Sequence, residues 1–316
     1  MSSKITVIGA GSVGSAITND ILVEGIASEV VLIDINKQKA VGEAMDIYQG
    51  APFCSPATIR SGDYEDAAGS QIVIITSGVP RKPDQARLEL AQTNVNILKE
   101  ITPQIVKYAP DAIYILVSNP VDILTYVFTK ISGIPENRIL GSGTVLDTSR
   151  LQSELARRFH ISPKNVHAHV YGEHGDSSFI PWSLATIANN KIDDYRNNIA
   201  DPDSICWSPA EHQAMEDFVK QSGAQVIKSK GATFYAVAIS VCHICKCILN
   251  GSGTALTVST MMHGEYGVDD VCLSTLALVG SNGVHTKITS PLTPEETEKM
   301  QLSAKKLKEI IKGLNI

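Results

Sequence analysis

Residues 4–34 read KITVIGAGSVGSAITNDILVEGIASEVVLID, and this stretch decides the fold. It begins with a short run rich in β-branched residues, 4–8, which predicts a buried strand. The run leads into a glycine motif, Gly9–Gly14, and then into apolar residues at helical spacing over 15–22. A second apolar run, 30–33, ends at Asp34. The order of strand, G-x-G-x-x-G, helix, strand and acid is the fingerprint of a dinucleotide-binding unit.

The glycines of this motif have different physical tasks. Gly9 permits a tight turn, Gly11 lets a pyrophosphate approach the backbone, and Gly14 lets the helix pack close to the strand. The start of the helix offers free N–H groups and the positive end of the helix dipole, which predicts phosphate binding at Ser12 and Val13.

Asp34 selects between the two nicotinamide cofactors. Its carboxylate would accept hydrogen bonds from the adenosine ribose and would repel a 2′-phosphate, so the sequence predicts NAD rather than NADP. Ser77 and Gly78 follow a buried strand, 71–76, as a loop and are also assigned to the cofactor. A glycine-rich loop can merely connect a strand to a helix, but here the flanking strand, helix and acid favour the cofactor.

Composition narrows the remaining classes of protein. The 316 residues are 43% hydrophobic and 19% charged, which is typical of a soluble globular protein. The net charge of −6 argues against nucleic acid or a membrane surface as a partner. No apolar run reaches the length of a membrane span, and no signal peptide is expected before the first strand, so the predicted location is the cytoplasm.

A cysteine cluster raises the alternative of a metal site. Cys242, Cys245 and Cys247 lie close together in the sequence, with His243 among them. The segment has a helical pattern that turns the last thiol away from the other two, and no second C-x-x-C completes a ligand set. The prediction is therefore no metal, with these thiols as small core residues in a reducing compartment.

The order of predicted elements gives an α/β fold. Strands alternate with helices through residues 1–143, which predicts a doubly wound parallel sheet (Rossmann) that forms a dinucleotide-binding domain. Residues 144–316 have longer helices and predicted strands at 166–170, 255–260 and 271–278, which predicts a mixed α+β substrate domain. An active site is expected where the two halves meet the carboxyl ends of the parallel strands.

Three groups of residues suit hydride-transfer chemistry. His174 lies between two glycines and can donate a proton to an alkoxide that forms as hydride arrives. Asp147 and Arg150 share one face of a helix, where the acid could hold His174 and the arginine could bind a carboxylate. The loop 78–87 carries arginines that could close over a substrate and polarise its carbonyl. Taken singly, these features also fit a surface ion pair, a loop histidine and a solvated loop.

The whole chain resembles the L-lactate/L-malate dehydrogenase superfamily. The resemblance rests on five segments, of which the longest are most like bacterial L-lactate dehydrogenases: 9–14, 118–120, 141–150, 171–177 and 230–233. It implies a cytoplasmic enzyme of glycolysis and fermentation that acts as a homo-oligomer, a tetramer or a dimer, on a small 2-oxo or 2-hydroxy acid.

The resemblance also implies a role for each matching side chain. His174 would be the acid/base with Asp147 as its partner, and Arg87 would be the loop arginine at the carbonyl. Substrate would be bound by Arg150 and Thr233, and by Asn119, which would also contact the nicotinamide ribose.

Arg81 departs from the usual lactate pattern. It lies six residues before Arg87, where lactate enzymes usually carry glutamine and malate enzymes carry an arginine for the second carboxylate. Arg81 thus favours malate as a substrate-binding residue, while Thr233 and the blocks around Asp147 and His174 favour lactate. L-lactate dehydrogenase is the first prediction and L-malate dehydrogenase the alternative.

A second departure concerns regulation. Many of the bacterial enzymes resembled here are activated by fructose 1,6-bisphosphate, held by a histidine and a basic residue from each subunit. His167 matches the histidine, but the basic position is occupied by the uncharged Gln152. Arg157 and Arg158 lie nearby and could partly substitute. We expect activity that does not require the sugar phosphate.

Overall fold

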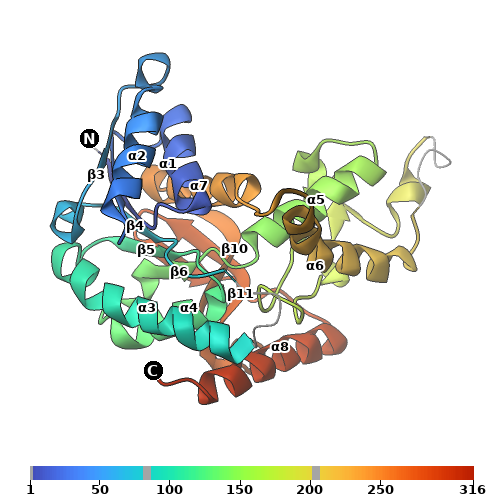
Figure 1. Ribbon diagram of the computed structural model, residues 1–316. Coiled ribbons are helices and arrows are strands. Elements are labelled where there is room, and N and C mark those ends of the chain that lie inside the picture. The colour runs from blue at the N-terminus through green and yellow to red at the C-terminus, as the bar shows by residue number, and fades with distance from the viewer. Residues whose placement is uncertain (1–2, 81–86, 201–206) are drawn as a thin grey trace.

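One large sheet organises the molecule. Figure 1 shows the computed structural model, which describes residues 3–80, 87–200 and 207–316. Within them the sheet has nine strands in the order β12-β11-β10-β6-β5-β4-β1-β2-β3. Their bounds are β1 Lys4–Ile8, β2 Glu29–Ile33, β3 Thr58–Ser61, β4 Ile72–Ile75, β5 Ile113–Leu116, β6 Ile139–Gly141, β10 Thr254–His263, β11 Asp269–Gly280 and β12 Gly283–Lys287.

Strands β1 to β6 pair in parallel, which confirms the doubly wound sheet predicted for the first half. They consist largely of isoleucine, valine and leucine because both of their faces are covered by helices. Strand β10 then pairs antiparallel with β6, and β11 and β12 continue the sheet. The two long strands predicted for the second half therefore extend the first sheet.

Two groups of helices cover the two faces of this sheet. One apolar core joins the sheet to α1 Ser12–Val23, α2 Lys37–Tyr48 and α7 Tyr235–Asn250, and α1 lies against α7 (Figure 1). The other joins it to α3 Arg87–Tyr108, α4 Val121–Ile131 and α8 Pro294–Lys312. Thr293 and Glu296 form a capping box at the start of α8.

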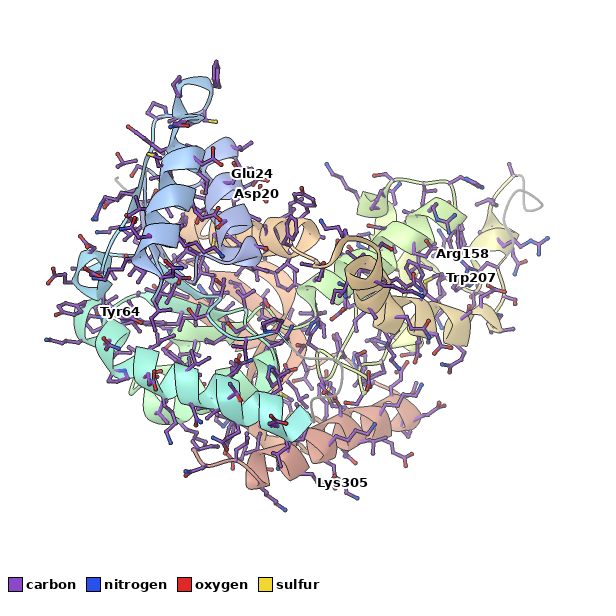
Figure 2. All side chains as sticks on the ribbon, in the orientation of Figure 1. Asp20, Glu24, Tyr64, Arg158, Trp207 and Lys305 are labelled. Atoms are coloured by element: carbon purple, nitrogen blue, oxygen red, sulfur yellow. The ribbon has the colours of Figure 1, made fainter. Side chains whose placement is uncertain are left out.

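A smaller lobe packs beside the sheet and has its own apolar core. It contains α5 Val145–Arg158, α6 Glu211–Lys230 and a three-stranded antiparallel sheet of β7 Val166–His167, β8 Thr186–Ile187 and β9 Asn190–Lys191. Figure 2 labels Trp207 in this lobe, where its ring lies 5.3 Å from that of Phe159. The strand predicted for 166–170 is shorter than expected, because the Val170 backbone bonds to the side chains of Thr144 and Thr148 at the start of α5 and not to β8.

Candidate active site

The glycine loop between β1 and α1 has the shape that the sequence predicts. Gly9 has a φ of +112°, and a Cβ there would lie 2.6 Å from Thr76 Oγ1. A Cβ on Gly14 would lie 1.8 Å from the Gly9 carbonyl oxygen, so only glycine allows the helix to approach the strand this closely. A Cβ on Gly11, by contrast, would meet nothing within 4 Å. Protein packing gives no reason for glycine at this position, whereas an approaching pyrophosphate does.

Helix α1 begins at Ser12, three residues earlier than predicted, with Gly11 as its N-cap. Gly11 has no side chain that could accept a hydrogen bond from the first N–H groups of the helix. The Ser15 N–H donates to the Gly11 carbonyl, which is the first hydrogen bond of the helix. The N–H groups of Ser12, Val13 and Gly14 therefore point out of the helix start, as a phosphate site requires.

Asp34 lies at the end of β2, directly beside this loop. Its Oδ2 accepts a hydrogen bond from the Ala10 N–H at 2.6 Å, and its Oδ1 accepts one from the Asn36 N–H at 2.8 Å. These bonds fix the carboxylate at the edge of the glycine loop, which is where an adenosine ribose would be recognised. The donors and the acid fit NAD, and the loop leaves room for its pyrophosphate.

A buried asparagine joins the two other loops assigned to the cofactor. The Asn94 side chain, 2% exposed, accepts a hydrogen bond from the Val79 N–H at 2.8 Å and donates one to the Asn119 carbonyl at 2.7 Å. Ser118 Oγ donates to the Ser77 carbonyl at 2.6 Å. The peptide bond between Asn119 and Pro120 is cis. The loop after β4 and the loop after β5 are thus held side by side by Asn94, a residue that no sequence motif predicted.

The three residues expected to carry the chemistry are in direct contact. His174 Nδ1 lies 2.5 Å from Asp147 Oδ2, and Arg150 Nη1 donates to Asp147 Oδ1 at 2.8 Å. The Asp147 side chain is 8% exposed, whereas 23% of the His174 side chain remains accessible. Because the acid engages Nδ1, the imidazole directs Nε2 away from it, as a proton donor to a bound ligand requires.

The Asp147 carboxylate stabilises both cations of this group, whereas Arg150 acts against the charge of His174. The Asp147 carboxylate raises the pKa of His174 to about 9, against the opposing effect of burial. Burial alone would raise the pKa of Asp147, but the charges of His174 and Arg150 hold it below its usual value. The site therefore holds an imidazolium and a carboxylate at neutral pH, and it can deliver a proton.

The arginine and the threonine assigned to substrate line one cavity of about 700 Å³. Arg150 enters it from α5, and Thr233 enters it from the turn between α6 and α7. A Cβ on Gly223 would lie 3.4 Å from Arg150 Nη2, so the backbone of α6 comes close to the guanidinium. Arg81 lies outside the described residues, as does the side chain of Arg87, the first residue of α3.

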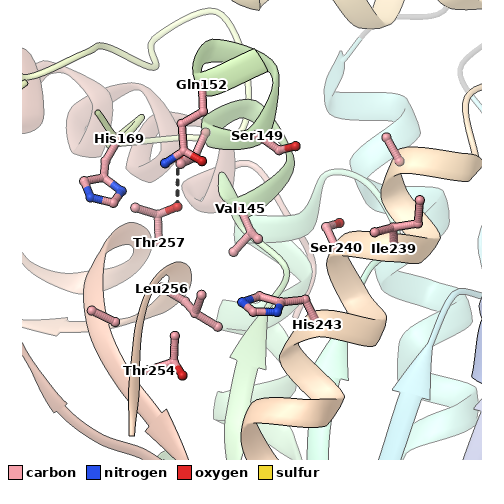
Figure 3. Close-up of a pocket in the computed structure, with 13 residues that line it drawn as sticks. Val145, Ser149, Gln152, His169, Ile239, Ser240, His243, Thr254, Leu256 and Thr257 are labelled. Atoms are coloured by element: carbon pink, nitrogen blue, oxygen red, sulfur yellow. Dashed lines mark hydrogen bonds between the residues drawn. The ribbon is translucent and has the colours of Figure 1, made fainter. Parts of the chain in front are cut away.

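A second cavity, of about 430 Å³, lies between α5, α7 and β10 (Figure 3). Gln152 and His169 line it on one side and His243 on the other. The Gln152 amide also donates to the Ala168 carbonyl at 3.1 Å. His167, the histidine considered for a sugar phosphate, is an exposed residue of β7 and does not line this cavity.

The glycine loop, Asp34 and the histidine–aspartate–arginine group together define a dehydrogenase that uses NAD. The family model for the lactate/malate dehydrogenase NAD binding domain matches residues 3–141. The model for the lactate/malate dehydrogenase alpha/beta C-terminal domain matches residues 144–315. The chain belongs to the lactate/malate dehydrogenase family.

Relatives within this family are similar over nearly their whole length. The chain is 46% identical to L-lactate dehydrogenase 1 of Clostridium acetobutylicum, over 99% of this chain and 98% of the relative. It is also 46% identical to an L-lactate dehydrogenase of Clostridium botulinum, over 97% and 95%. A ligand-bound structure of the minor L-lactate dehydrogenase of Enterococcus mundtii matches with a TM-score of 0.94 and 36% identity, covering 100% of this chain and 99% of the other.

Proposed function

We propose that the protein is an L-lactate dehydrogenase, which reversibly transfers hydride between NADH and pyruvate. The observation that carries the proposal is the contact of His174 and Arg150 with one buried carboxylate, that of Asp147. The similarity to L-lactate dehydrogenases supports pyruvate as the substrate.

In this proposal NAD supplies or accepts the hydride, and the chain binds and orients the reactants. The residues that would hold NAD are Gly9, Gly11, Ser12, Val13, Gly14, Asp34, Ser77, Gly78 and Asn119. A guanidinium has five N–H donors, so Arg150 can pair with Asp147 and still bind a substrate carboxylate. His174 donates its Nε2 proton to the carbonyl oxygen during reduction and takes a proton back during oxidation. Arg87 polarises the carbonyl, and Thr233 and Asn119 contact the substrate.

The test of the proton donor is His174→Asn. Turnover of pyruvate should fall by about 10²- to 10⁴-fold, since the variant lacks a general acid, while NADH binding measured by fluorescence should persist. His263→Asn is a matched control, because His263 is exposed and pairs with Glu136 instead. Near-normal turnover by His174→Asn would contradict the assignment.

The alternative function, that of an L-malate dehydrogenase, can be tested by replacing Arg81. A second carboxylate in a water-excluded pocket needs a cation opposite it, so an Arg81 that faces substrate would favour oxaloacetate. We expect kcat/KM to be higher for pyruvate than for oxaloacetate in the unmodified protein. A large preference for oxaloacetate that Arg81→Gln reverses would replace lactate by malate in the proposal.

We further propose a cytoplasmic homo-oligomer, a tetramer or a dimer. Exposed apolar side chains recur at helical spacing on two helices: Val41, Met45 and Tyr48 on α2 are 44%, 59% and 47% exposed, and Tyr235 and Ile239 on α7 are 66% and 56% exposed. Grouped apolar side chains on a surface commonly belong to interfaces. The five cysteines in the described part of the chain are free thiols, which suits a reducing compartment. None of the helices in that part is long and apolar enough to cross a membrane. Light scattering after size exclusion measures the mass, and a monomer would contradict the proposal.

A further inference from the structure

A buried acid outside the group of Asp147, Arg150 and His174 contacts the loop that carries His174. Asp122, in the first turn of α4, is 2% exposed. Its Oδ2 accepts a hydrogen bond from the backbone N–H of His174 at 2.7 Å. Its Oδ1 accepts a second bond from Ser259 Oγ of β10 at 2.6 Å. One carboxylate therefore joins α4, the loop that carries His174, and strand β10, which pairs with β6 in the large sheet.

Burial and neighbouring charges both act on the pKa of Asp122. Burial raises its pKa to about 6, while its hydrogen bonds and the charge of His174 act in the opposite direction. Glu173, from the same loop, raises it further. The Cys272 thiol of β11 is close enough that the Asp122 charge raises its pKa, after the larger effect of burial. Asp122 is thus mainly ionised at neutral pH, and its negative charge acts on His174.

The charged groups that act on His174 come from two elements. Asp147 of α5 and Asp122 of α4 raise its pKa, and Arg150 of α5 lowers it. Asp147 contacts the imidazole ring, whereas Asp122 bonds the backbone of the same residue. Two carboxylates therefore act on one histidine from different sides, and only Asp147 has an arginine partner in the group.

We propose that Asp122 is a positioning residue for His174, which fixes the backbone of the proton donor and favours its imidazolium through the negative charge of its carboxylate. This inference rests on the proposed role of His174 as the acid. Asp122 also links His174 to the loop assigned to the cofactor. That loop contains Asn119, whose carbonyl is bonded by Asn94, and Asp122 follows three positions later in the first turn of α4. The backbone of the proton donor and the loop assigned to the nicotinamide are thereby both tied to the first turn of one helix.

Two substitutions separate the charge from the hydrogen bonds. In Asp122→Asn the amide oxygen can accept from the His174 N–H, and the amide N–H can donate to Ser259 Oγ, so only the charge is lost. The alkaline limb of kcat/KM for pyruvate reduction should move down by about half a pH unit or more, because His174 then loses its proton more readily. The KM for pyruvate at pH 6.5 should change little, since Arg150 is intact. In Asp122→Ala both bonds are lost, and kcat should fall by at least about tenfold.

Two further variants serve as controls. Asp111→Asn also removes one negative charge, but the Asp111 side chain is 94% exposed and pairs with Arg138, so the alkaline limb should not move. Ser259→Ala removes one hydrogen bond and keeps the charge of Asp122, so it should lower kcat without moving the alkaline limb. Circular dichroism and NADH binding show whether each variant is folded.

An alkaline limb in Asp122→Asn that coincides with those of the unmodified protein and Asp111→Asn overturns the proposal. Wild-type kcat in a folded Asp122→Ala overturns it as well. If Asp122→Ala does not fold, the comparison of Asp122→Asn with Ser259→Ala still decides. Failure of the proposed function is distinguishable, because it would show as turnover by His174→Asn, which does not depend on Asp122.

Discussion

Replacing Asp147 by asparagine should change the pH dependence of catalysis in a way that the structure quantifies. Asp147 is the main cause that raises the pKa of His174 from 6.5 to about 9. That difference corresponds to about 3 kcal/mol in favour of the imidazolium. Without the carboxylate, burial remains and acts in the opposite direction, so the pKa should return to 6.5 or below.

The loss of kcat/KM for pyruvate reduction in Asp147→Asn should therefore grow with pH. At pH 8 the protonated fraction of His174 should fall from about 0.9 in the unmodified protein to about 0.03 in Asp147→Asn. The ratio of their kcat/KM values for pyruvate reduction should rise by about twenty- to thirtyfold between pH 6 and pH 8. Lactate oxidation needs neutral His174, so at pH 8 its loss should be smaller than the loss of reduction.

The assay is the initial rate of NADH consumption at low pyruvate between pH 6 and pH 10. Asp193→Asn is the matched control, because Asp193 also pairs with a histidine, His212, at 2.8 Å, but in the small lobe. Its profile should match that of the unmodified protein. A ratio for Asp147→Asn that stays constant with pH would refute the view that Asp147 sets the acid strength of His174.

Gly11→Ala should fold with normal stability and lose at least about tenfold in NADH affinity, because its Cβ faces open space where phosphate would lie. Gly14→Ala should lower the free energy of unfolding by about 1–3 kcal/mol or more, because its Cβ clashes with the Gly9 carbonyl. Calorimetry and NADH titration distinguish the two. Asp34→Ser should raise kcat/KM with NADPH relative to NADH, and equal use of both cofactors by the unmodified protein would show that Asp34 is not at the ribose. Millimolar fructose 1,6-bisphosphate should leave the rate at low pyruvate unchanged, and many-fold activation would contradict the interpretation of Gln152.

The parts of the site that the sequence predicts are those set by local geometry. Asp147 and Arg150 are three residues apart in a helix, so their contact follows from helical spacing. The glycine loop likewise connects consecutive elements, and each of its glycines has a steric or ligand-based reason. Near neighbours in the chain are placed by rules that need no knowledge of the remaining fold.

The residues that were missed depend on distant partners. Asp122 bonds Ser259 across 137 positions, and Asn94 bonds the Asn119 carbonyl across 25. A signal was present in both cases, because each is a polar residue on the apolar face of a helix. Such a residue indicates a buried partner but does not identify it. The attachment of β10 to β6 was missed for the same reason, since the choice of sheet edge is made in three dimensions.

The junction between β6 and β10 affects how the chain can be divided. Gly141 pairs with Ser259 there, and a Cβ on Gly141 would lie 2.4 Å from Thr125 Oγ1 and 3.0 Å from the Ser259 Cβ. A fragment that stops at residue 143 would leave β6 as a bare sheet edge of apolar residues, and such edges pair with other chains. Although two family models meet near this position, we expect the amino-terminal half expressed by itself to aggregate and to become soluble when the carboxyl-terminal half is co-expressed.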